Sequence, residues 1–171
     1  LNFLTGDEFE ERLRAYLIRA IRKGVPPLFV DIKPLYSDPI KGQVLDVMVS
    51  GFMENLLKLG SFDADGKVLE PPTCLLWTYY FMSQRYDFKG DYVAALDLVN
   101  KAIEHTPTLI ELFMLKGKIF KHAGDPDEAV RCLDEAQSMD TADRYINCKC
   151  AKYMMRANMV SEAEAMCSKF T

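Results

Sequence analysis

Apolar residues recur three and four positions apart along most of the chain, a spacing that keeps them on one face of an α-helix. The first such stretch covers residues 7–23, where Phe9, Leu13 and Leu17 share a face and charged residues occupy the others. Gly24 ends this helix, because glycine readily adopts the left-handed conformation found at helix C-termini. The pattern therefore predicts an amphipathic helix near the start of the sequence.

A second long helix is predicted to begin at Asp38, which is followed by a proline, a pair suited to the N-cap and first turn. Its apolar residues continue to Leu59, and Gly60 supplies the stop. Residues 28–36, between the two helices, contain a proline and show no clear period, so their structure stays open. Residues 61–73 form a predicted loop, since they contain an Asp-Gly turn and two consecutive prolines.

The rest of the chain repeats itself with a period of 34 residues, which relates Ala95 to Ala129 and Ala129 to Ala163. Residues of similar size recur at the same offset in further columns: Ser83, Gly117 and Ala151; Tyr86, Phe120 and Met154; Gly90, Gly124 and Asn158; Val99, Leu133 and Cys167; Ala102, Ala136 and Phe170. We therefore expect helical repeats at 76–109 and 110–143 and a truncated one at 144–171. Residues 1–75 do not hold this register and are expected to form irregular helix pairs.

Each repeat is expected to contain two helices that approach closely. A small residue in the first helix (Ser83, Gly117 or Ala151) faces an alanine in the second, and small residues allow close packing. The turn between the helices carries Gly90, Gly124 or Asn158, residue types that tolerate positive φ angles. The pattern thus predicts three tight helical hairpins.

Capping residues support the predicted boundaries of the second repeat. Asp125 precedes a proline and is followed three positions later by Glu128, an order typical of a helix N-terminus. Thr108 and Glu111 have the same spacing and predict a capping box at the preceding helix.

The order of large and small residues resembles the tetratricopeptide (TPR) template, which predicts an all-α, TPR-type helical repeat solenoid. Several segments, at residues 70–73, 106–113, 121–124, 134–137, 149–154 and 166–171, are also similar to the auxiliary subunit of the N-terminal acetyltransferase A (NatA) complex. The resemblance covers nearly the whole chain and is densest after residue 70. It identifies the chain as an internal fragment of a member of that family.

The resemblance implies a scaffold that wraps and activates a separate catalytic subunit and helps to dock the complex at the ribosome in the cytoplasm. Acetyl-CoA would then be bound by the partner. The alternative is a general TPR adaptor that binds a peptide or the C-terminus of a chaperone. Five cysteines, an odd number without the spacing of a disulfide scaffold, are expected to be free thiols in a reducing compartment.

The sequence lacks the motifs of an active site. It contains no glycine-rich phosphate loop, no nucleophile elbow and no paired metal-binding histidines, and only two histidines occur in total. Cys148 and Cys150 have no second Cys/His pair at zinc spacing, so we interpret them as buried or half-buried thiols and expect no metal. A net charge of −4 and the absence of a long apolar run argue against general nucleic-acid or membrane binding.

A local basic patch stands out on this acidic chain. The first helix of each repeat lines the inner face of such a solenoid, and helical spacing places these residues on that face: Lys118, Lys121, His122, Lys149, Lys152, Tyr153 and Arg156. Lysines that only keep a helix soluble are the alternative explanation. Because several cations share one face, we favour an anionic partner. In the resembling family, inositol hexakisphosphate bridges scaffold and catalytic subunit in some members, and these residues are its predicted ligands.

Overall fold

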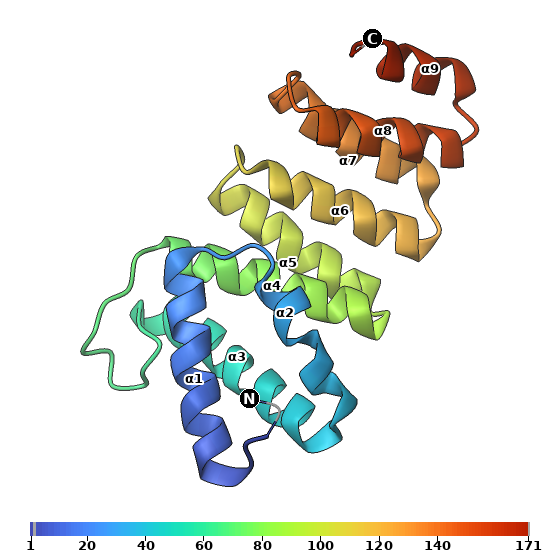
Figure 1. The fold of residues 1–171 in the computed structure, drawn as a ribbon. Helices are drawn as coiled ribbons and strands as arrows, with labels where there is room; N and C mark the ends of the chain where they lie inside the picture. The colour runs from blue at the N-terminus through green and yellow to red at the C-terminus, as the bar shows by residue number, and fades with distance from the viewer. Residues whose placement is uncertain (2, 171) are drawn as a thin grey trace. The chain divides into compact units, whose positions relative to one another are not determined.

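A computed structural model describes residues 1 and 3–170, and every regular element among them is helical (Figure 1). The chain divides into two compact units, Leu1–Met82 and Ser83–Thr171. Helix α4 (Thr73–Lys89) contributes residues to both.

The first unit contains α1 (Gly6–Lys23), α2 (Leu28–Ile32), a 3-10 helix (Lys33–Ser37) and α3 (Pro39–Leu59). The apolar stripe of α1 is buried as predicted, with Leu13 and Leu17 fully inaccessible, and Leu45 and Val49 of α3 are equally buried. The segment that the sequence left open thus forms a short α-helix followed by a 3-10 turn.

Both ends of α3 follow the predicted chemistry. The side chain of Asp38 accepts hydrogen bonds from the backbone N–H groups of Ile40 and Lys41, at 3.0 and 3.3 Å. At the other end Gly60 adopts φ of 64°, and its N–H donates to the carbonyl of Leu56. A left-handed glycine closes the helix at little steric cost.

The loop after α3 is held by two arginines of α1. Arg22 binds both carboxylate oxygens of Glu70, with N···O distances of 2.8 and 2.5 Å, and the Glu70 side chain is only 4% exposed. Arg14 pairs with Asp63 at 2.5 Å. Next to Asp63, the ring of Phe62 packs edge-on against Phe52, with centroids 5.0 Å apart. Both ends of the loop are therefore anchored to α1.

Gly51 offers a simple test of the α3 assignment. It lies inside this helix, and a Cβ atom built on it meets nothing within 4 Å. Alanine avoids the entropic cost of a helical glycine, so Gly51→Ala is expected to stabilise the fold by about 0.5–1 kcal/mol. A higher urea midpoint, followed by circular dichroism, would confirm this; a lower midpoint would show that the space around Gly51 is filled.

The second unit contains α5 (Tyr92–His105), α6 (Ile110–Ala123), α7 (Pro126–Met139), α8 (Arg144–Arg156) and α9 (Val160–Ser168), together with the end of α4. Helices α6 and α7 fall within the predicted repeat at 110–143, and α8 and α9 within the one at 144–171. Helix α4 begins three residues before the first predicted repeat, at Thr73 rather than at 76. The limits of the repeats themselves stay a prediction.

The helices of the second predicted repeat approach closely at Gly117, as the small-residue columns predict. A Cβ atom on Gly117 would lie 2.2 Å from a methyl carbon of Leu133 and 3.1 Å from the carbonyl oxygen of Ala129. In the preceding pair, the Ser83 hydroxyl donates a 2.8 Å hydrogen bond to the carbonyl of Ala95. The turn between the two helices of each predicted repeat contains a residue with a positive φ angle. The angles are 82° at Gly90, 86° at Gly124 and 60° at Asn158.

One capping prediction is correct and one is wrong. Asp125 accepts a 3.0 Å hydrogen bond from the N–H of Glu128, as expected of an N-cap. Thr108 does not cap α6, because it lies in a turn and the next residue, Leu109, has the extended backbone of the N-cap position, without a side-chain hydrogen bond. The helix therefore begins one residue too late for the threonine hydroxyl to act.

Candidate anion-binding site

The structure brings cationic residues of α6 and α8 together. Lys118 and Lys121 lie one turn apart on α6, and the charges of Arg156, Lys118 and Lys149 all act on Lys121. Burial lowers the pKa of Lys121 the most, and these three cations lower it further. We call Lys118, Lys121, Lys149 and Arg156 the basic cluster. The other three cations repel the Lys121 ammonium, and the carboxylate of Asp87 offsets part of this effect.

Tyr153 contacts two members of this cluster and is 8% exposed. The Lys121 ammonium lies 5.9 Å from its ring centroid and the Arg156 guanidinium 5.7 Å, both within the range of a cation–π interaction. Burial raises the pKa of the Tyr153 hydroxyl, so it stays protonated at neutral pH. The ring thus holds two cations, one from each helix.

Tyr145 has a similar role that the sequence analysis missed. Its ring centroid lies 5.3 Å from the Lys149 ammonium. The two residues are four positions apart on α8, and this spacing was the available signal. Lys152, also predicted as a ligand, is exposed on α8, one turn from both Lys149 and Arg156.

His122, the remaining predicted ligand, binds a carboxylate of the preceding helical hairpin. Its Nδ1 atom lies 2.7 and 3.0 Å from the two carboxylate oxygens of Asp87 on α4. The Asp87 side chain is 4% exposed and that of His122 is 34% exposed. Asp87 also acts electrostatically on Lys121 and Tyr153. Sequence analysis did not connect Asp87 with His122.

The cysteines divide by exposure. Burial raises the pKa of the thiols of Cys74, Cys132 and Cys150 to about 11, so these three are poor nucleophiles at neutral pH. Cys148 is exposed, in contrast to the predicted buried or half-buried thiol, because it lies on the helix face opposite the core contacts of Cys150. Among the residues that the structure describes, no group of His, Cys, Asp or Glu is arranged to hold a metal ion.

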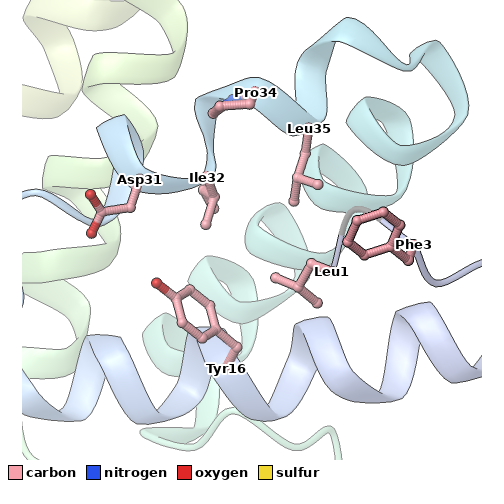
Figure 2. A pocket seen from close by; sticks show the side chains of 7 residues that line it. All are labelled: Leu1, Phe3, Tyr16, Asp31, Ile32, Pro34 and Leu35. Carbon is pink, nitrogen blue, oxygen red and sulfur yellow. The ribbon is translucent and has the colours of Figure 1, made fainter.

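The first unit contains a hollow of about 300 Å³, lined by Leu1, Phe3, Tyr16, Asp31, Ile32, Pro34 and Leu35. Figure 2 shows the apolar side chains of Leu1, Phe3 and Leu35 at one end and the polar ends of Tyr16 and Asp31 at the other. A single carboxylate beside apolar groups does not form a catalytic pair. No described helix has both the length and the apolar character needed to cross a membrane.

Several known proteins are similar to this chain in sequence. A mouse protein, "N-alpha-acetyltransferase 16, NatA auxiliary subunit", is 49% identical over 172 residues, which cover all of this chain and 20% of the relative. "N-terminal acetyltransferase A complex auxiliary subunit NAA15" of Arabidopsis thaliana is 43% identical over 171 residues, covering 100% of this chain and 19% of that protein. The chain thus spans about a fifth of the length of the curated relatives it matches.

A solved structure described as "Structure of Naa15/Naa10 bound to HypK-THB" matches all of this chain and 24% of its own, with a TM-score of 0.86 and 36% identity. This likeness confirms the predicted all-helical, TPR-type solenoid fold. The family described as "N-terminal acetyltransferase A, auxiliary subunit" matches residues 1–171. The chain therefore belongs to the family of NatA auxiliary subunits.

Proposed function

We propose that this chain is a segment of a non-catalytic scaffold that wraps and activates the catalytic subunit of a protein N-terminal acetyltransferase. Family membership and the likeness to a Naa15/Naa10 assembly support the proposal. In the complete protein, other parts would help to dock the complex at the ribosome in the cytoplasm. Acetyl-CoA would be bound by the catalytic partner.

The basic cluster carries the specific part of the proposal. Lys118, Lys149 and Arg156 act together on Lys121 and lower its pKa, on a chain whose net charge is −4. A multivalent phosphate would relieve this repulsion and form charge-assisted hydrogen bonds with the ammonium and guanidinium groups. Inositol hexakisphosphate has the charge and compactness to engage all four, and we propose that it bridges this surface to the catalytic subunit.

Calorimetry on the full-length auxiliary subunit assembled with its catalytic partner tests this proposal. Inositol hexakisphosphate should bind, and its affinity should fall steeply as salt rises, because the screening length shrinks from about 10 Å at 0.1 M to about 3 Å at 1 M. At 100 times the dissociation constant, the ligand should stabilise the complex by about 2.7 kcal/mol.

Uncharged inositol is the matched control and should give neither heat nor stabilisation. Binding of a chaperone C-terminal peptide at these residues, with no response to the polyphosphate, would instead favour the general adaptor.

A further inference from the structure

Helix α3 is apolar on two different faces. One face is buried, and Leu45 and Val49 are fully inaccessible there. The other face carries a second stripe at helical spacing, formed by Ile40, Val44, Val47 and Met48. Within this outer stripe Ile40 is 76% exposed and Val47 is 67% exposed. A helix with apolar residues on more than one face is normally covered on each of them, so the outer stripe indicates a contact surface.

The outer stripe lines a groove of about 420 Å³, together with one residue of α1. The lining residues are Glu10, Ile40, Gln43, Val44, Val47 and Met48. Gly51 continues the stripe one turn beyond Val47, and a Cβ atom built on it meets nothing within 4 Å. A partner's backbone can therefore approach α3 closely at this glycine. From Ile40 to Gly51 the surface extends along about 16 Å of helix, which is three turns.

The charge at the edge of the groove restricts what can bind there. Glu10 is the one charged side chain among the six lining residues, and it is exposed. Asp7, also exposed, lies one turn earlier on the same face of α1. Neither carboxylate takes part in an ion pair among the residues that the structure describes. A partner that covers the groove removes water from Glu10, which costs free energy unless a cation pairs with the carboxylate.

We propose that the groove between α1 and α3 binds an amphipathic helix of a partner protein. Apolar residues of that helix, spaced three and four apart, pack on Ile40, Val44 and Val47, and a lysine or arginine at the edge of its apolar face pairs with Glu10. A helix fits because its backbone hydrogen bonds are internal and its side-chain spacing matches that of the stripe. The groove belongs to the first unit and the basic cluster to the second, so the two sites do not depend on each other.

A second copy of this chain is a poorer occupant of the groove. Two copies related by a twofold axis would meet through the same surface. Each would present the same Glu10 and would bring no cation from the lining of its own groove. The carboxylates would then lose water without gaining a partner. Charge complementarity therefore favours a different protein with a basic, amphipathic helix.

Peptide binding to the full-length auxiliary subunit, assembled with its catalytic partner, tests the proposal. The probe is a fluorescein-labelled peptide of about 18 residues, long enough to form a helix, with leucines at helical spacing and flanking lysines. One control peptide has the same composition in scrambled order, and another has glutamates in place of the lysines. Fluorescence anisotropy should show binding of the lysine peptide, and at least tenfold weaker binding of both controls.

Two substitutions assign the binding to this groove. Val47→Asp places a charge in the apolar contact and should weaken the lysine peptide at least tenfold. The matched control is Val93→Asp, because Val93 is 82% exposed on α5 and its replacement makes the same change in charge; it should bind as wild type does. Glu10→Lys should weaken the lysine peptide about fivefold and strengthen the glutamate peptide, a reversal that general adsorption to an acidic surface does not produce.

Three results would overturn the proposal. The first is equal binding by Val47→Asp and Val93→Asp. The second is no peptide binding together with a lower melting temperature of full-length Val47→Asp, which would show that another segment of the same chain covers the groove. The third is self-association of the complex that Val47→Asp abolishes, again without peptide binding, which would assign the groove to a second copy.

Discussion

Reversing the charges of Lys121 and Arg156 together is expected to lower the affinity for inositol hexakisphosphate by about 100-fold or more. Each substitution removes a charge-assisted contact and adds a repulsive carboxylate, and two such losses amount to at least ~3 kcal/mol even after allowance for solvent exposure. Both cations also lie against the ring of Tyr153, so Lys121→Glu combined with Arg156→Glu removes one contact between α6 and α8 and one within α8.

Calorimetry on the assembled complex measures the first effect, and recovery of the catalytic subunit in a pull-down measures its consequence. The matched control is Lys101→Glu with Arg131→Glu, which makes the same change in net charge on α5 and α7. There the side chains are 49% and 76% exposed, and each forms an ion pair with a carboxylate of its own helix. Equal loss of affinity in both double variants would mean that net charge, and not the basic cluster, governs binding.

Gly117→Val is expected to destabilise the second unit by about 3 kcal/mol. Even one added carbon meets Leu133 at 2.2 Å and the Ala129 backbone at 3.1 Å, and valine adds two further methyl groups. Leu133 is 1% exposed and so enclosed by its neighbours, and the tight contact with the Ala129 backbone is expected to force α6 and α7 apart. Overpacking of this kind costs about 1–3 kcal/mol, and the rigid backbone contact places valine at the upper end.

Equilibrium urea unfolding, monitored by helical ellipticity, provides the measurement. Gly51→Ala is the natural comparison, since it also adds carbon to a helical glycine but is expected to raise the midpoint. A Gly117→Val variant with the wild-type midpoint would show that these helices pack less tightly than the structure indicates.

The second unit was largely predictable because its constraints repeat. Ser83, Gly117 and Ala151 occupy equivalent places, so each supports the interpretation of the others, and the positive φ angles at the turns follow from the same columns. Thr108 shows the limit of such reasoning. It is a suitable capping residue at the right spacing from Glu111, but it does not cap α6 because the helix begins one residue later than expected. Local motifs do not determine where a helix begins.

The candidate site was predictable only in part. Helical spacing found Lys118, Lys121 and Arg156, because the first helices of successive repeats present equivalent faces. The pairing of Asp87 with His122 was not accessible, since the two residues are 35 positions apart, which is one more than the repeat length. The contact joins side chains of α4 and α6 that do not occupy equivalent positions in the repeat. A column of equivalent positions therefore cannot reveal it.

The fastening of the loop after α3 has an evolutionary consequence. Asp63 and Glu70 are each held by an arginine of α1, and the backbone N–H of Glu70 also donates to the carbonyl of Gly60 at 2.7 Å. Changes in length between these anchors would leave the ends of the loop in place, and the entropic cost of a longer loop grows only slowly with length. The tip of this loop is therefore a place where homologous proteins can gain or lose residues without disturbing the helices on either side.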